Sequence, residues 1–219
     1  MVMETKKRKA LITFVCLIFA LVAVFLGLIL GKEIKNMTDT ATLNNTVIEG
    51  YTYTLRANAT EVQKEYFKEL REALDENDPG NIDEVKAVAK CFIADFYTWT
   101  NKNGNYDIGG YLFYYEPKRN SFALCSKNYF YRNMYYVAQE YGKENLPQVK
   151  EVIIDESTLE KNKSTTEIKG ETYPVYLIKA DIVYEDSTYD TSSLQQYTYV
   201  YVITGYENEC RVISVYGDW

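Results

Sequence analysis

The first feature of the hydrophobic pattern is a long uncharged stretch near the N-terminus. Positions 10–30 carry no charged side chain, and a helix of that length spans roughly 31 Å, close to the hydrocarbon thickness of a bilayer. Basic residues occupy 6–9, and the positive-inside rule keeps such a cluster in the cytoplasm. The pattern therefore predicts a cytoplasmic basic tail over 1–9, a transmembrane helix over 10–31 and an extracellular remainder.

A cleaved signal peptide is the competing interpretation of this stretch. The apolar core of a signal peptide is usually roughly 7–15 residues long and ends at a site of small residues. This run is longer, and it ends in Leu30-Gly31-Lys32 without such a site. We therefore expect a retained signal anchor, which places the protein in the cell membrane.

The segment that follows, 32–59, is polar and has no regular pattern over most of its length. Apolar and polar residues alternate only around Val47–Leu55, which suits a short strand or an extended lead-in. The composition predicts a flexible extracellular linker over 32–59.

Two amphipathic helices are expected next. Thr60 and Gln63 have the spacing of a reciprocal helix cap, and apolar residues then recur at helical spacing until Asp78-Pro79-Gly80 ends the pattern. Asn81 and Glu84 repeat the capping pattern. The second apolar stripe, whose last residues are expected to pack beneath a sheet, consists of Val85, Val88, Ala89, Phe92, Ile93, Phe96 and Trp99.

The pattern then predicts a short aromatic strand over Tyr111–Tyr115 and a third helix over about Ser126–Tyr141. After Leu146-Pro147 the hydrophobic period changes to two, in four segments that form a meander. The polar loops between strands are expected at 156–170 and 186–193. Helices followed by antiparallel strands predict an α+β fold class.

Composition narrows the possible chemistry. The chain has 22 Tyr and no His, which excludes a Ser-His-Asp or Cys-His nucleophile pair and every zinc site that contains histidine. The net charge is -7, and removing four basic and one acidic residue of the first nine leaves -10. An acidic domain repels phosphate backbones, so we expect no direct binding of nucleic acid.

Metal and cofactor sites are not expected either. Beyond Cys16 in the predicted span, three cysteines remain, and their spacing matches no metal ribbon. One disulfide, for example Cys125 to Cys210, is compatible with this count. The loop Asn101–Asp107 has oxygen-bearing side chains at alternate positions, as calcium loops do, but neutral Asn replaces most charged ligands and a plain turn is favoured.

The order of two helices, a short strand, a third helix and an antiparallel sheet resembles the nuclear transport factor 2-like superfamily, a cystatin-like α+β roll. The resemblance covers about 60–219 and is one of layout, without a signature motif. It implies three helices packed on a curved antiparallel sheet, with a pocket between helices and sheet. Behind a single span, the layout is similar to bitopic assembly factors of type IV secretion and conjugation systems and to uncharacterised envelope proteins of Firmicutes.

The superfamily also includes isomerase-like enzymes, which need a carboxylate base and a Tyr or protonated Asp as hydrogen-bond donor. Asp95 and Asp181 are the carboxylates available in regular elements. Asp181 shares a strand face with Lys179, which indicates a solvated ion-pair face, and no spacing singles out a base. We therefore expect a protein that is not an enzyme.

Tyrosine marks the predicted functional surface. Tyr131 and Tyr135 are four residues apart and lie off the inward stripe of the third helix, so they are expected to share an exposed face that contacts a partner. The predicted function is a single-pass membrane protein whose non-catalytic extracellular roll domain makes protein contacts in a cell-envelope assembly, such as conjugation or secretion. Its partners would be other envelope proteins or a second copy. The alternatives are small-molecule or glycan binding in the roll pocket, or an isomerase-like enzyme.

Overall fold

The structure is a computed structural model, and the residues that it describes are 46–75, 80–159 and 163–216. The predicted basic tail at 1–9 and the predicted transmembrane helix at 10–31 lie outside the described residues, as does most of the predicted linker. Within the described ranges, no helix is both long enough and apolar enough to cross a bilayer. A compact unit begins at Val47, and the fold is described from there.

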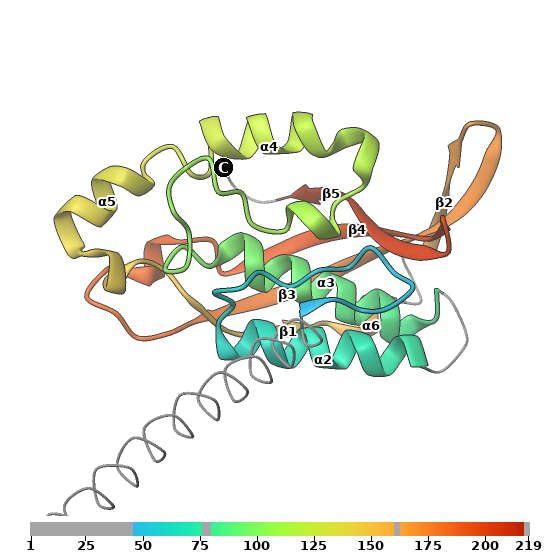
Figure 1. The fold of residues 1–219 in the computed structure, drawn as a ribbon, viewed down its shortest axis with the longest axis horizontal. Helices are drawn as coiled ribbons and strands as arrows, with labels where there is room; N and C mark the ends of the chain where they lie inside the picture. Colours follow the sequence, from blue (N-terminus) through green and yellow to red (C-terminus); the bar gives the residue numbers. More distant parts are fainter. Residues whose placement is uncertain (1–45, 76–79, 160–162, 217–219) are drawn as a thin grey trace, which may run out of the picture. The chain divides into compact units, whose positions relative to one another are not determined.

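The unit has an α+β fold, as predicted, with helices packed on a five-stranded antiparallel sheet (Figure 1). The order across the sheet is β1-β3-β4-β5, and β2 also pairs with β3. The strands are β1 Val149–Ile154, β2 Lys163–Ile168, β3 Glu171–Tyr184, β4 Tyr197–Tyr206 and β5 Glu209–Tyr216.

The longest strand, β3, pairs with two strands along one edge. Its first half pairs with β2 and its second half with β1, while β4 occupies the opposite edge. The prediction of a polar loop over 156–170 is therefore wrong, because this segment contains the short helix α6 (Glu156–Leu159) and β2. Lys169 and Gly170 both have positive φ, at 54° and 86°, which gives the two-residue turn that joins twisted antiparallel strands.

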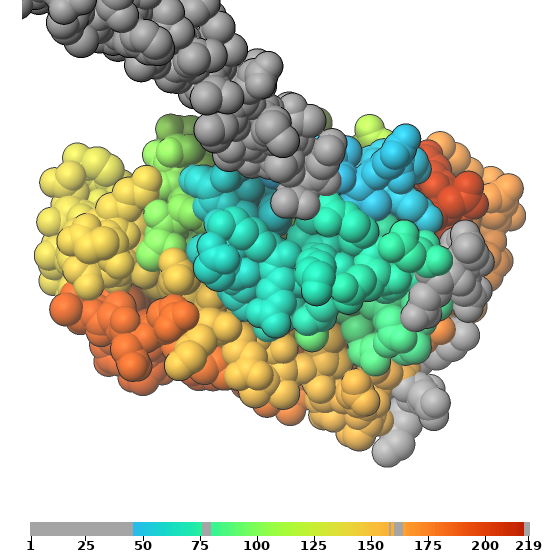
Figure 2. Space-filling model, turned by 60° about the horizontal axis from the view of Figure 1, so that its bottom comes forward, coloured from blue at the N-terminus to red at the C-terminus, as the bar shows by residue number. Residues whose placement is uncertain are grey.

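Two helices pack on the sheet where the sequence predicts them. Helix α2 (Glu61–Asp75) packs against α3 (Ile82–Tyr97), and α3 in turn contacts β1, β3, β4 and β5. The reciprocal cap is confirmed, because the Thr60 N–H donates to Gln63 Oε1 at 3.0 Å and the Gln63 N–H donates to Thr60 Oγ1 at 3.4 Å. Figure 2 shows α2 on the outer surface of this face, with the segment after Val47 beside it.

The predicted third helix is two helices separated by a break. Helix α4 (Arg119–Asn128) overlaps only the first three residues of the predicted helix, 126–128. Helix α5 (Met134–Tyr141) begins six residues after α4 ends. At the break the Tyr131 N–H donates to the Ser126 carbonyl at 2.9 Å, a bond that spans five residues rather than four. The interruption turns residue 131 away from the face that helical spacing assigns to it.

The predicted aromatic strand at 111–115 is also wrong. The segment forms two short 3-10 helices, η1 (Tyr111–Phe113) and η2 (Glu116–Lys118). Only one bridge to the sheet forms here, between Tyr114 and Val212, and the Tyr115 N–H donates to the Val212 carbonyl at 2.8 Å. Gly110 precedes η1 with a φ of +70°, a left-handed conformation that glycine adopts without strain.

The segment 47–59 belongs to the compact unit rather than to the predicted flexible linker. The side chain of Tyr53 is fully buried, and its hydroxyl lies 2.9 Å from Glu84 Oε1 and 2.8 Å from the Cys210 N. Glu84 is itself buried in the first turn of α3, and its Oε2 accepts from the Gly80 N–H at 2.6 Å. The domain therefore starts before Thr60, because this network attaches the segment to α3 and β5.

Candidate functional site

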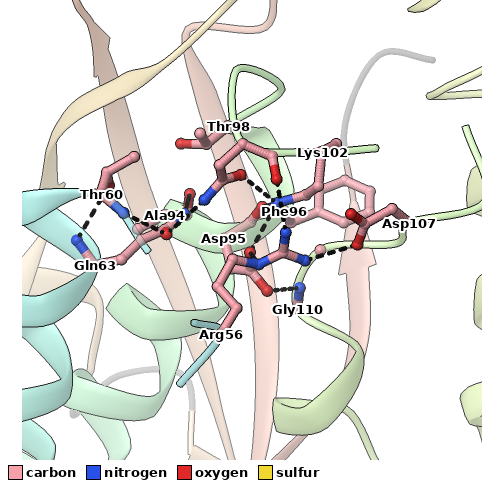
Figure 3. Close-up of polar contacts among 12 residues, drawn as sticks. Arg56, Thr60, Gln63, Ala94, Asp95, Phe96, Thr98, Lys102, Asp107 and Gly110 are labelled. Atoms are coloured by element: carbon pink, nitrogen blue, oxygen red, sulfur yellow. Dashed lines mark hydrogen bonds and ion pairs between the residues drawn. The ribbon is translucent and has the colours of Figure 1, made fainter. Parts of the chain in front are cut away.

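A cluster of four charged residues joins three parts of the chain (Figure 3). Arg56 precedes α2, Asp95 lies in the last turn of α3, and Lys102 and Asp107 belong to the loop that follows α3. Arg56 Nε lies 2.8 Å from Asp95 Oδ1 as an ion pair, although the N–H is not aligned for a hydrogen bond. Arg56 Nη2 donates to Asp107 Oδ1 at 3.0 Å. Arg56 thus bridges two carboxylates.

Lys102 lies on the inner side of this cluster, and its side chain is fully buried. Its Nζ lies 2.7 Å from Asp95 Oδ1 and also donates to the Asp95 carbonyl at 2.8 Å and to Asn101 Oδ1 at 3.0 Å. Burial lowers the pKa of Lys102, and the nearby Asp95 carboxylate opposes this effect without cancelling it. Three acceptors therefore satisfy the three N–H bonds of the buried ammonium.

The loop Asn101–Asp107 is a turn, and its last residue, Asp107, accepts a hydrogen bond from Arg56. Asp107 Oδ2 accepts from the Asn103 N–H at 2.9 Å, so both carboxylate oxygens have protein donors. Burial by itself would raise the pKa of Asp107, but the hydrogen bonds from Arg56 and Asn103 outweigh burial and lower it. Among the described residues, no group of three or more Asp, Glu or Cys side chains is placed to hold a metal ion.

A pocket of about 410 Å³ opens beside Arg56. Its walls come from the segment before α2, from α2, α3 and α4, and from η1 and the loop that leads into it. The lining residues are Thr54, Leu55, Arg56, Gln63, Cys91, Asp95, Tyr106, Asp107, Ile108, Tyr111, Leu112, Phe113 and Ala123. None of these residues belongs to the sheet, so this is not a pocket between helices and sheet of the kind that the family resemblance implies.

Two glycines allow the wall of this pocket to lie against α3. A Cβ atom on Gly109 would lie 2.1 Å from the Asp95 carbonyl oxygen, and one on Gly110 would lie 2.5 Å from the Phe92 ring. The Gly110 N–H donates to Asp95 Oδ2 at 2.8 Å. The close approach requires glycine at both positions, and it fixes Asp95 from a second side.

The candidate bases of an isomerase-like reaction are not brought together. Both oxygens of Asp95 already have protein donors, from Lys102 on one oxygen and Gly110 on the other. Asp181 is exposed on β3, opposite Ile153 and Tyr197, and does not line the pocket. A general base needs a free oxygen directed at the substrate, and neither carboxylate has this arrangement.

The structure separates the two predicted contact residues, because Tyr131 is buried and Tyr135 is exposed. Tyr131 has 0% exposure, its hydroxyl donates to the Phe96 carbonyl, and it accepts from the Gly109 N–H at 3.2 Å. Burial raises the pKa of Tyr131 well above its ordinary value. The predicted exposure of Tyr131 is wrong because it lies in the break between α4 and α5, where helical spacing does not apply.

Tyr135 forms an exposed aromatic pair with its neighbour Tyr136, and not with Tyr131 as the sequence predicts. The two side chains are 65% and 69% exposed, and their rings meet edge to face with centroids 5.6 Å apart. Of the eight residues of α5, only Met134 is buried. The pairing was not predicted because the sequence indicates one long helix, whereas α5 has eight residues and leaves two neighbouring positions outside the core.

The cysteines of the described ranges are free thiols. Cys91 and Cys210 are buried and Cys125 is exposed, so the disulfide considered between Cys125 and Cys210 is absent. Burial raises the pKa of the Cys91 thiol, which lines the pocket, well above its ordinary value. A thiol in that environment stays protonated and is a poor nucleophile.

The geometry thus offers an exposed aromatic pair on α5 and a pocket beside a charge-balanced cluster. Comparison of the chain with protein-family models, with curated proteins and with solved structures found no match.

Proposed function

We propose that the chain is a single-pass membrane protein whose extracellular domain is non-catalytic and binds another protein of a cell-envelope assembly, as in conjugation or secretion. The observation that carries this proposal is the exposed Tyr135–Tyr136 pair on α5. The partner is another envelope protein or a second copy of the chain.

The membrane part of the proposal is supported by the pattern at the N-terminus. The uncharged run at 10–30 has the length of a bilayer span, and the basic residues at 6–9 orient it. Of the layout that resembles the nuclear transport factor 2-like superfamily, the described residues keep the two N-terminal helices and the antiparallel sheet but not the short strand or the single third helix.

The proposal of a binding domain rather than an enzyme rests on the state of the carboxylates. Asp95 and Asp107 are engaged by Arg56, Lys102 and backbone donors, and the pKa of Asp107 is lowered. Base catalysis near neutral pH favours the opposite arrangement, a carboxyl group with a raised pKa and a free oxygen.

The aromatic pair has the properties of a protein contact. Tyrosine offers a large rigid ring with a polar tip and loses little side-chain entropy on binding, and aromatic residues concentrate the binding energy of interfaces. Helix α5 presents both rings from adjacent positions, while Met134 and the partly buried Val137 and Ala138 pack against the core. Removing the two rings should therefore affect binding without affecting the fold.

The test replaces both residues with serine and measures crosslinking in native membranes. A photoreactive amino acid at Gln139, which is exposed on the same helix, reports the protein that lies against α5. We expect Tyr135→Ser/Tyr136→Ser to lose most of the crosslinked product, because truncating a central aromatic residue typically costs about 2 kcal/mol or more of binding energy.

The matched control is Tyr197→Ser/Tyr216→Ser, which removes two exposed tyrosines from the strands. This control should keep the crosslinked product. Equal crosslinking in both double variants, each with a normal unfolding midpoint, would overturn the proposed contact at α5.

A further inference from the structure

The pocket beside Arg56 has the size and lining of a small-molecule site. Its volume of about 410 Å³ lies within the range of about 300–1,000 Å³ that is usual for ligand pockets. Apolar and aromatic side chains form most of its walls: Leu55, Cys91, Tyr106, Ile108, Tyr111, Leu112, Phe113 and Ala123. Such walls favour a ligand whose surface is mainly apolar, because its burial releases water from both surfaces.

The polar part of the pocket offers hydrogen-bond donors. Arg56 Nη1 donates to the Asn101 carbonyl at 3.1 Å, and Nη2 donates to Asp107 Oδ1 at 3.0 Å. Each of these nitrogens carries two N–H bonds, so within the described ranges one N–H on each has no protein acceptor. The carboxylate oxygens of Asp95 and Asp107, in contrast, all have protein donors.

The charge balance of the four-residue cluster indicates which ligand charge the pocket favours. Arg56 and Lys102 balance Asp95 and Asp107, so an anion meets no net positive charge at this position. A cation finds no carboxylate oxygen without a donor. A neutral molecule with an acceptor oxygen fits both conditions, because it can use the remaining Arg56 N–H bonds without adding charge to a partly buried site.

The walls are fixed in place before a ligand arrives. The Gly109-Gly110 turn lies against α3, and the Tyr131 hydroxyl bonds both to the Gly109 N–H and to the Phe96 carbonyl. Arg56 is held by three groups of the loop and α3. A pocket that is already ordered loses less entropy when it binds a small molecule.

We propose that this pocket binds a small, uncharged, mainly apolar molecule that presents a carbonyl or similar acceptor oxygen to Arg56. The site is separate from the tyrosine pair on α5, so this proposal does not depend on the proposed protein contact. It locates a ligand between α3, α4 and the loop before η1, away from the strands.

The test uses benzophenone, a neutral two-ring ketone that inserts into nearby C–H bonds under ultraviolet light, with the full-length chain in membranes. Peptide mapping by mass spectrometry locates the label, so partition of the probe into lipid does not confuse the result. We expect label on 106–113 and on Ala123 or its neighbours in α4. Benzophenone-4-carboxylate, which has the same rings and a negative charge, should label these residues much less.

Two neighbouring substitutions on α4 separate filling of the pocket from a general effect on the helix. Ala123 lines the pocket, whereas Leu124 is exposed and does not. We expect Ala123→Phe to lower labelling of 106–113 by about tenfold, because small changes of volume in an apolar pocket have effects of this size. Leu124→Phe should leave the labelling unchanged.

Competition with the wild-type chain keeps the test decisive if Ala123→Phe does not fold. Benzanilide has two rings and a carbonyl but is not photoreactive, and it should protect the pocket from benzophenone. Diphenylmethane has two rings and no oxygen, and it should protect less. The proposal is overturned if benzophenone labels no pocket residue or if the charged probe labels these residues equally. It is also overturned if Ala123→Phe and Leu124→Phe are both folded and are labelled alike, or if the two competitors protect equally.

Discussion

Neighbouring tyrosines of this chain have different roles, and the backbone between them decides which role each has. Tyr131 lies in the break after α4 and uses its hydroxyl to join the Phe96 carbonyl to the Gly109 N–H. Tyr135 is the second residue of α5, and its side chain is exposed to solvent. Tyrosine is thus a buried residue that hydrogen-bonds two backbone groups at position 131 and a solvent-exposed residue at position 135.

This difference predicts opposite effects of removing one hydroxyl. Tyr131→Phe removes the side-chain acceptor of the buried Gly109 N–H, so the free energy of unfolding should fall by about 1–3 kcal/mol. Tyr135→Phe removes an exposed hydroxyl and should change it by less than about 0.5 kcal/mol. Equilibrium denaturation of both variants, followed by near-ultraviolet circular dichroism, measures the difference, and equal values would contradict the placement of Tyr131.

At the scale of elements, the loop after α3 depends on charge to hold its conformation. Asp107 is bonded to Arg56 and to the Asn103 N–H, and Lys102 is bonded to Asp95 within the same cluster. The loop forms one side of the pocket. Protonation of Asp107 therefore weakens the hydrogen bonds that hold the loop and the side chain of Arg56 in place.

The lowered pKa of Asp107 gives a pH dependence with a definite sign. A carboxyl group whose pKa is lower in the folded state stabilises the fold above its unfolded pKa, near 3.8, and this stabilisation disappears as the pH falls through the folded value. We expect Asp107→Asn to be less stable than wild type at pH 7, and the difference to shrink towards acid pH.

The measurement is the unfolding midpoint as a function of pH. Asp186→Asn, in an exposed loop position, is the control and should follow the wild-type curve. A difference between wild type and Asp107→Asn that stays constant with pH would show that the charge of Asp107 contributes nothing to stability.

The sequence predicts the regular elements of this fold better than its irregular ones. Helices α2 and α3 are predicted because their caps at Thr60 and Asn81 and their apolar stripes act locally. Strand β2 is missed because Lys163–Ile168 is polar, and its pairing with β3 supplies what its composition lacks. The break at 129–133 is missed because its residues have helical spacing, and only their tertiary contacts interrupt the helix.

The pocket was harder to predict than the fold, since its residues come from distant parts of the chain. Arg56 lies in a segment whose composition indicates a linker, and nothing in that segment points to Asp95 or Asp107. The sequence did single out Asp95 as a carboxylate in a regular element and the Asn101–Asp107 loop as a turn. The sequence does not show that Asp95 and Asp107 both pair with Arg56, because this pairing depends on how α3 and the loop fold against Arg56.

At the scale of the whole molecule, the proposed topology can be tested through Cys125. This thiol is exposed, whereas Cys91 and Cys210 are buried. We expect a membrane-impermeant maleimide to label intact cells at Cys125, and Cys125→Ser to abolish this labelling. The same protein, extracted from membranes, should keep its N-terminal residues in an intact-mass measurement.

Either of two results would contradict this topology. A protein whose N-terminus begins near Gly31 would show that the apolar segment is cleaved. Labelling of Cys125 only after the cells are opened would place the domain inside the cell.

The attachment of residues 52 and 53 determines how the domain responds to tension. A pulling force transmitted along the chain from its N-terminal part enters the compact unit at Val47. It reaches Thr52 and Tyr53 before α2, and these residues are bonded to Glu209, Glu84 and Cys210. We therefore expect the load to pass to the start of α3 and to β5 before it reaches α2 and the pocket beside Arg56.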